Sequence, residues 1–174
     1  IRKLAENLGV AFRFNGEVFG RIGGDPGPMA EGLPPDESVR IEKEDPLHRD
    51  LWNRMLQDQA PRSRPRLFRC RAGRQNFHIG PYGDLNVCIL MRKAVWELRS
   101  GSFRQGWEEA IPRLIATPAE EDECDRCDLL ALCFPCPAKG DLETGDMTQK
   151  PEGLCRRSRA IARALREETE AVAV

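Results

Sequence analysis

The sequence has no long apolar segment, few aromatic residues and almost no net charge. None of its 174 residues lies in a run of about 18 apolar residues, the length that a membrane-spanning helix needs. Its 27 basic and 28 acidic residues give a formal net charge of −1, so no global positive field attracts nucleic acid or an anionic membrane. Hydrophobic residues make up 40% and aromatic residues 6%. We therefore expect no nucleic-acid partner, no membrane, and a lean core that needs further stabilisation.

The sequence also lacks the features of a disulfide-bonded secreted protein. It starts at Ile1 without the basic, apolar and small-residue pattern of a secretory signal, and its seven cysteines are an odd number. A disulfide framework calls for an even count in an oxidising compartment. Because clustered thiols in a reducing compartment more often bind metal, we expect a cytoplasmic protein whose cysteines are metal ligands.

Residues 1–60 predict one α/β unit. The expected elements are a helix at 1–8, a strand at 10–14, a loop at 20–35 and helices at about 36–44 and 47–58. The first helix has Ile1, Leu4, Ala5 and Leu8 on one face and ends at Gly9. Asn15–Gly16 either ends the strand or turns the chain into a hairpin. We expect this unit to begin inside a longer gene, with its companion units upstream.

Residues 61–174 predict a second part, joined to the first by a linker at 61–66. The expected elements are strands at 75–79 and 85–89 around a turn at 80–84, a helix that begins near Ser102, and a last helix over about 156–172. This last helix is highly charged and carries a thin apolar stripe of Ile161, Ala164 and Leu165. Ser102 and Gln105 have the spacing of a capping box, and Pro112 should kink or restart the helix. The predicted fold class is α+β.

A dense C-x2-C-x5-C-x2-C run carries the clearest chemical signal, at Cys124, Cys127, Cys133 and Cys136. Two residues between thiols let both sulfurs reach one metal centre from a single tight turn, and the apolar residues 129–132 would shield that centre from water. The run is typical of a structural zinc site with four thiolates and equally of iron–sulfur ligation. Buried thiols without metal are a third interpretation. The spacing alone leaves zinc and iron–sulfur open.

With the other cysteines, this run resembles the SPASM domain of radical S-adenosylmethionine (SAM) enzymes. Cys70 is followed by twelve residues, Gly83, four residues and Cys88, which matches the first part of the family pattern. The resemblance covers about residues 65–160. Cys124, Cys127 and Cys133 match the next part, Cys136 comes one residue earlier than in the family, and Cys155 supplies the final thiol.

The resemblance implies two auxiliary [4Fe-4S] clusters with interleaved ligands. Seven thiols leave one iron without a cysteine, and His78 and Asp84 are the candidate non-cysteine ligands by their proximity in the sequence. The structural alternative makes His78 a half-exposed strand residue and Asp84 a turn residue. A compact zinc site would use the dense run as one unit, whereas the family scheme divides it. Cluster I would be held by Cys70, Cys88 and Cys136, and cluster II by Cys124, Cys127, Cys133 and Cys155.

By the same resemblance, residues 1–60 are the last part of the partial TIM-like barrel of a radical SAM enzyme, and residues 61–174 are the SPASM domain with a C-terminal helix. The Gly- and Pro-rich loop at 20–28 follows the predicted strand, at the face where barrel active sites are built, although such residues also simply turn a chain. The C-x3-C-x2-C motif of the SAM-cleaving cluster does not occur in these residues. We expect SAM and a third [4Fe-4S] cluster only in the full-length parent.

The resemblance implies a function for that parent. It would be an oxidoreductase that modifies a ribosomal peptide or a protein side chain, with an electron donor or acceptor as a further partner. Two other functions stay open. One is a zinc-binding interaction module without catalysis, which would use the four-cysteine run. The other is a ferredoxin-like electron carrier that works alone.

Overall fold

The computed structural model describes residues 1–22, 24–57, 66–91, 93, 95–120 and 123–172. The α-helices are α1 (Arg2–Asn7), α2 (Pro35–Lys43), α3 (Pro46–Gln57), α4 (Phe103–Gln105), α5 (Ile111–Ile115), α6 (Pro137–Thr144) and α7 (Glu152–Val172). The strands are β1 (His78–Ile79), β2 (Asp84–Asn86) and β3 (Trp96–Glu97). The predicted α+β class is therefore confirmed. Apart from Arg66, the predicted linker at 61–66 lies outside the described residues.

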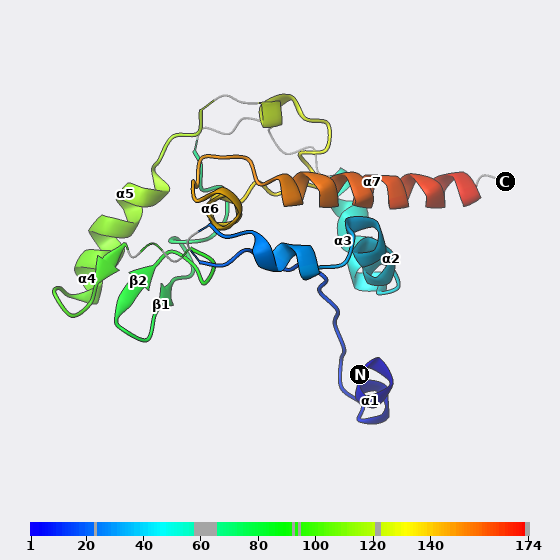
Figure 1. Ribbon diagram of the computed structural model, residues 1–174, viewed down its shortest axis with the longest axis horizontal. Helices are drawn as coiled ribbons and strands as arrows, with labels where there is room; N and C mark the ends of the chain where they lie inside the picture. The colour runs from blue at the N-terminus through cyan, green and yellow to red at the C-terminus, as the bar shows by residue number, and fades with distance from the viewer. Residues whose placement is uncertain (23, 58–65, 92, 94, 121–122, 173–174) are drawn as a thin grey trace.

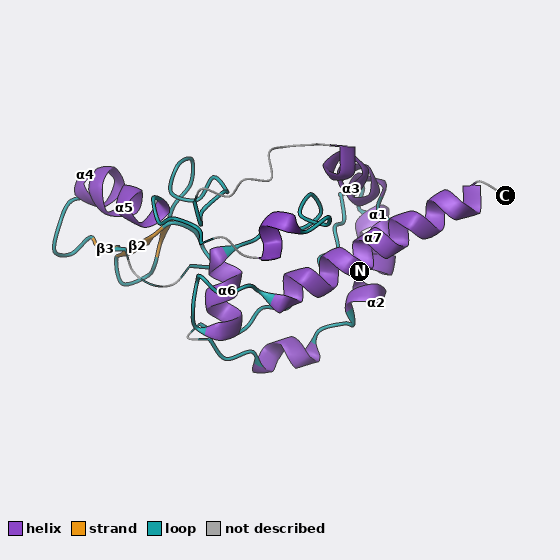
Figure 2. Cartoon of the chain, turned by 90° about the horizontal axis from the view of Figure 1, so that it is seen from above, coloured by secondary structure: helices purple, strands orange, loops and turns teal. Residues whose placement is uncertain are grey.

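The elements form two lobes. Figure 1 shows the small sheet with α4 and α5 at one end, α7 extending toward the other end beside α2 and α3, and α1 set apart below them. Seen from above, α6 lies between the sheet lobe and α7 (Figure 2). No helix within the described ranges is both long and apolar enough to cross a membrane.

The helical lobe is held by α7, which packs against α2. The apolar stripe predicted on the last helix is confirmed, because Ile161 and Leu165 are buried together with Val39 of α2 and Trp52 of α3. The helix begins at Glu152, four residues earlier than predicted, directly after Pro151. Proline has no backbone N–H to donate, so it is well suited to the residue before a helix.

A buried carboxylate joins this lobe internally. Glu42 of α2 has a relative exposure of 1%, and it accepts hydrogen bonds from both terminal nitrogens of Arg157 on α7. The same carboxylate accepts the Ser38 hydroxyl at 3.3 Å and the Gly16 backbone N–H at 3.2 Å. Three separate segments therefore meet on one side chain.

The sheet lobe has its own core, formed by residues from β2, α5 and the adjoining loops. The predicted hairpin is confirmed in outline: β1 pairs antiparallel with β2, with His78 opposite Asn86, and Gly83 takes the left-handed conformation in the turn (φ 89°). The strands are shorter than predicted. A third strand, β3, which no sequence pattern indicated, pairs with the other edge of β2. The largest buried residues of this core are Phe68, Leu85, Val87, Met91 and Ile111.

The helix that begins at Phe103 follows its sequence signals. Ser102 and Gln105 form the predicted capping box, with the Gln105 N–H donating to the Ser102 hydroxyl at 3.2 Å. A π-helical segment over Gly106–Ala110 then precedes α5, which has Pro112 in its first turn. The predicted restart at Pro112 is confirmed, because proline cannot donate to the preceding turn and the helical spacing changes just before it.

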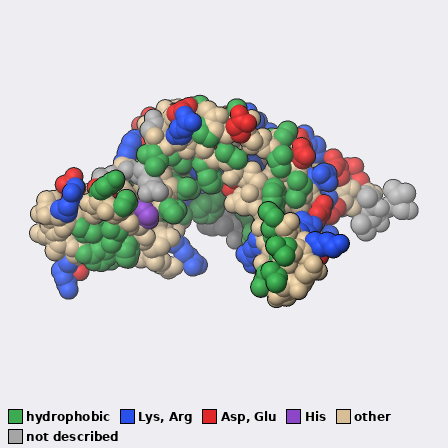
Figure 3. Space-filling model, turned by 60° about the horizontal axis from the view of Figure 1, so that its bottom comes forward, with side chains coloured by type: hydrophobic (Ala, Val, Ile, Leu, Met, Phe, Trp, Pro, Cys, Tyr) green, Lys and Arg blue, Asp and Glu red, His purple; other side chains and the backbone are tan. Residues whose placement is uncertain are grey.

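The strand predicted at 10–14 was wrong, and so was the hairpin alternative through Asn15–Gly16. Residues 10–20 run without helix or sheet structure. A strand needs a neighbour to accept and donate its backbone hydrogen bonds, and no other strand among the described residues pairs with this segment. The apolar face predicted for residues 1–8 is likewise not buried, since Leu4 and Leu8 are 60% and 66% exposed. Figure 3 shows this hydrophobic stripe over α1 and a second hydrophobic area over the sheet lobe.

The buried ion pair yields a stability prediction. Glu42→Gln keeps the size of the side chain but leaves Arg157 without its anion, so we expect the free energy of unfolding to fall by about 3 kcal/mol. The matched control is Glu44→Gln, which removes an exposed pair with Arg2 and should cost less than about 1 kcal/mol. Urea unfolding followed by circular dichroism measures both. Equal losses for the two substitutions would contradict the anchoring role of Glu42.

Candidate metal centre

All seven cysteines lie within the described part of the chain, as free thiols. They come from separate elements: Cys88 follows β2, Cys136 is the N-cap of α6, and Cys155 lies in the first turn of α7. Cys124 lies in a 3-10 segment (Glu123–Arg126) and is the one buried cysteine; the others are half-buried. The folded chain therefore keeps most of the sulfurs partly accessible, which is what ligation of an inserted metal requires.

Three of the cysteines belong to the sheet lobe. Cys70, Cys88 and Cys136 all pack against its hydrophobic core, although 66 residues separate the first from the last in sequence (136 − 70). Cys88 and Cys136 are electrostatic neighbours, because a thiolate at Cys88 raises the pKa of Cys136. The Met91 backbone N–H also lies 3.4 Å from the Cys88 sulfur. These are the three residues predicted as ligands of cluster I.

The Cys136 thiol is set in a mixed environment. Burial raises its pKa above the ordinary value of 9.0, while hydrogen bonds from the backbone N–H groups of Lys139 and Ala138 act in the opposite direction. Those amides belong to the first turn of α6, where the helix has unpaired N–H groups. Amide donors aimed at sulfur are one of the ways in which proteins tune a ligating thiolate.

A second pair of sulfurs lies at the start of α7. Burial is the first cause that raises the pKa of Cys155, and the neighbouring Cys133 is the second. Lys150 acts in the opposite direction by its positive charge. Cys133 and Cys155 were both predicted as ligands of cluster II. Along the dense run, the Cys127 N–H donates to the Cys124 carbonyl at 3.2 Å, which gives the tight turn expected of a two-residue spacer.

The two groups meet at a small cavity of about 30 Å³. Cys124, Cys133, Cys136 and Cys155 line it, with Lys150 and Pro151 on the α7 side. Of the apolar residues expected to shield a metal, Leu130 and Leu132 are buried, but Leu132 packs into the core under α7. Shielding of the sulfurs therefore falls largely to the neighbouring prolines and to Leu67, which also lines this cavity.

The cysteine sulfurs of the described residues are not gathered around a single point. Among the described residues, no three His, Cys, Asp or Glu side chains come close enough together to hold one metal ion. A structural zinc site needs four sulfurs, each about 2.3 Å from one point. A four-iron core carries its thiolates on separate iron atoms and so keeps them further apart.

His78 lies on β1 and Asp84 on β2, but they are not opposite each other, because His78 pairs with Asn86. The Asp84 carbonyl accepts the Gly80 N–H at 2.8 Å, which closes the turn as the structural alternative expects. Neither residue joins a three-ligand group in the described part of the chain. Their role as a non-cysteine ligand stays a prediction.

Sequence analysis missed α6, the helix that carries the amides facing Cys136. A signal was present, because Cys136–Pro137 places proline at the first helical position, and Gly145 ends the helix in the left-handed conformation (φ 80°). The basic side chain of Arg74 near Cys70 also has a structural use. It donates to the carbonyls of Phe68 and Cys70 at 3.2 and 2.7 Å, and so fixes the loop that carries this thiol.

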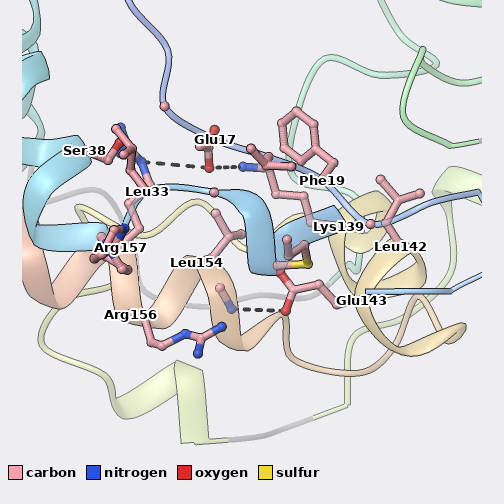
Figure 4. Close-up of a pocket in the computed structure, with 18 residues that line it drawn as sticks. Glu17, Phe19, Leu33, Ser38, Lys139, Leu142, Glu143, Leu154, Arg156 and Arg157 are labelled. Atoms are coloured by element: carbon pink, nitrogen blue, oxygen red, sulfur yellow. Dashed lines mark hydrogen bonds and ion pairs between the residues drawn. The ribbon is translucent and has the colours of Figure 1, made fainter. Parts of the chain in front are cut away.

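A larger cavity of about 240 Å³ lies on the other side of α6 and of the start of α7. Figure 4 shows it between the segment at 16–20, the loop before α2, and the two helices. Glu17, Lys139 and Arg157 form its charged side. No sequence pattern indicated this cavity, because it arises where residues distant in sequence pack together.

Comparison with protein-family models, with curated proteins and with solved structures found no match to this chain.

The raised pKa of Cys136 can be measured in the metal-free, reduced protein. We expect its alkylation by iodoacetamide to have a pH midpoint above 9.0, because burial favours the protonated thiol. Since the folded state holds this proton more tightly than the unfolded state, its contribution to stability is complete below 9.0 and is lost as pH rises through the folded-state pKa. Mass spectrometry of the modified peptide gives the midpoint, with a short cysteine peptide blocked at both ends as the reference in the same sample. A midpoint at or below that of the reference would contradict the prediction.

Proposed function

We propose that this chain binds two auxiliary [4Fe-4S] clusters as the C-terminal, SPASM-type part of a radical SAM enzyme that modifies a ribosomal peptide or a protein side chain. The observation that supports the proposal is the grouping of Cys136 with Cys70 and Cys88 against the core of the sheet lobe, while Cys133 adjoins Cys155 at the start of α7. Cys136 also lines the small cavity with Cys124, Cys133 and Cys155, so the two groups adjoin each other. Interleaved ligation by two clusters is consistent with both features.

The assignment keeps the two ligand groups separate. Cys70, Cys88 and Cys136 would hold the first cluster, and Cys124, Cys127, Cys133 and Cys155 the second. Clusters of this kind supply one-electron acceptor or donor chemistry, or an open iron for a substrate group. The residues of this chain provide the thiolates, the amides of α6 that face Cys136, and the positive charge of Lys150 near Cys155. Amide donors and positive charge both favour the thiolate over the thiol, and so favour ligation.

The main alternative is a zinc-binding interaction module without catalysis. It would need Cys124, Cys127, Cys133 and Cys136 around one ion, and the described residues contain no such group. Colour and metal content separate the two functions directly. The separate electron carrier is less favoured, because α2 and α3 build a substantial lobe that a small carrier does not need.

Anaerobic reconstitution tests the proposal. We expect a brown protein with broad visible absorption and about eight irons per chain. Cys127→Ala should remove the iron of the second cluster and Cys70→Ala should disturb the first, so the two variants should differ in their paramagnetic spectra after reduction. Arg166→Gln, on the exposed side of α7, is the control and should keep the full iron content. A colourless protein with one or two zinc ions, or identical spectra for the two cysteine variants, would overturn the proposal.

Metal removal should also destabilise the fold, because ligation ties distant parts of a lean chain together. We expect chelation or prolonged exposure to air to lower the thermal midpoint by more than roughly 10 °C, since each kcal/mol shifts the midpoint of a chain of this size by about 2–4 °C. Differential scanning calorimetry with parallel iron analysis gives both quantities. An unchanged midpoint after complete loss of iron would count against ligation as a structural element.

A further inference from the structure

The cavity of about 240 Å³ is largely apolar, and only some of its polar groups have hydrogen-bond partners among the described residues. Its size lies just below the roughly 300–1,000 Å³ of sites for drug-sized ligands, and above the roughly 150 Å³ that holds a benzene ring. The volume therefore suits one large side chain rather than a nucleotide. The apolar lining consists of Val18, Phe19, Met29, Leu33, Leu142 and Leu154, with Pro34 and Pro35.

One wall of the cavity is the segment at 16–20, which is fixed at both ends. A Cβ added at Gly16 would lie 2.1 Å from the Ser38 hydroxyl oxygen, and one at Gly20 would lie 2.3 Å from the Leu142 carbonyl oxygen. The segment thus touches α2 at one end and α6 at the other, and it spans the cavity between them. Only glycine permits both approaches.

The backbone of this segment is paired at Gly16 and Glu17 but not at Val18 and Gly20. Neither Val18 nor Gly20 makes a hydrogen bond to another residue in the described part of the chain. Both residues line the cavity. Unpaired backbone N–H and C=O groups beside an apolar cavity are the arrangement by which proteins bind a peptide main chain, while a pocket takes one of its side chains.

Most charged groups of the cavity neutralise one another. Glu17 accepts a hydrogen bond from Lys139 at 2.6 Å and lies 3.8 Å from the Arg157 Nε atom, as the dashed lines in Figure 4 show. The Lys139 ammonium also lies 5.1 Å from the centre of the Phe19 ring. Glu143 accepts the backbone N–H of Gly153 at 3.0 Å.

Arg156 is the exception. It lies on the α7 side of the cavity, opposite Glu17 and Lys139 in Figure 4, and it makes no hydrogen bond or ion pair with another described residue. Arg157 is paired with Glu42 and Lys139 with Glu17, so Arg156 is the one cation of this lining without an ion-pair partner among the described residues. An exposed guanidinium beside an apolar cavity is suited to a carboxylate, which it can bind through two hydrogen bonds.

From these observations we propose that the cavity binds a peptide segment in which a large apolar side chain is followed by a carboxylate. The apolar side chain fills the cavity, the peptide backbone pairs with Val18 and Gly20, and the carboxylate binds Arg156. The carboxylate is either an Asp or Glu side chain or a free C-terminus, and the two present the same group. This inference deepens the proposed function. It rests on that function only in treating the bound peptide as the substrate of the enzyme.

The test compares the affinities of the full chain for a set of fluorescein-labelled tetrapeptides. Binding is measured by fluorescence anisotropy. The probes are Gly-Phe-Asp-Gly-amide, its Asn counterpart and its Ala-Asp counterpart, with Gly-Gly-Gly-Phe carrying a free carboxylate as the C-terminal form. We expect the Phe-Asp peptide to bind about tenfold more tightly than the Asn and the Ala-Asp peptides, because a paired charge or a buried aromatic ring contributes on this scale. The tighter of the Phe-Asp and C-terminal probes identifies the source of the carboxylate.

Three variants place the binding in the cavity. Arg156→Gln should weaken the Phe-Asp peptide about tenfold and remove its advantage over the Asn peptide, which is the signature of direct coupling. Leu33→Trp, at an exposed position of the lining, should fill the cavity and abolish binding of both. Arg166→Gln lies on the same helix outside the cavity and should leave binding unchanged.

Two results would overturn the inference: no saturable binding of any probe, or an Arg156→Gln variant that still distinguishes Asp from Asn. Iron content and visible absorption are recorded on each sample. Specific peptide binding to a protein that takes up no iron supports the cavity and overturns only the cluster proposal. A fully loaded protein that binds no probe overturns the cavity and leaves the clusters supported.

Discussion

The helical lobe depends on the hydrogen bonds that the Glu42 carboxylate accepts. The carboxylate is buried in α2, yet it binds the guanidinium of Arg157 on α7 and receives the Gly16 N–H from the irregular segment before α2. A carboxylate removed from water is costly unless its lone pairs are occupied, so these partners must stay in place together. The segment at 16–20, the second helix and the last helix are therefore positioned as a set. The wall of the larger cavity is one result of this constraint.

The two lobes have separate hydrophobic cores, and each is small. One core centres on Val39, Trp52 and Ile161, and the other on Leu85 and Ile111. Cys70, Cys88 and Cys136 pack against the core that contains Leu85, whereas Cys155 lies on α7, whose buried residues belong to the other core. Bonds between sulfur and metal would supply the cohesion that a chain with 6% aromatic residues gains only in part from apolar burial. Metal ligation and the folding of this chain would then be thermodynamically coupled.

Local signals predicted more of this fold than long-range ones. The capping box at Ser102 and the stripe on α7 depend on spacing within one helix, and both were confirmed. The strand predicted at 10–14 was wrong. Alternating apolar residues indicate a segment with one buried side, but a strand also requires a neighbouring strand to pair with. The same limit applies to the candidate site. Sequence spacing grouped the cysteines, but the amides behind Cys136 and the cavity beyond α6 depend on packing between distant residues, for which the sequence carries no periodic signal.

Lys139 connects the two candidate sites of the molecule. Its backbone N–H faces the Cys136 sulfur, while its ammonium group binds Glu17 in the wall of the larger cavity. A ligated Cys136 is a thiolate and accepts this N–H more strongly than a thiol does, so ligation would hold the first turn of α6 in place. Lys139 of this first turn also binds the Glu17 carboxylate. It thereby holds the segment at 16–20, whose unpaired backbone groups at Val18 and Gly20 line the cavity. The proposed peptide site and the candidate metal site therefore share a structural element, so a chain without bound metal should have a less ordered cavity wall than a metal-loaded chain.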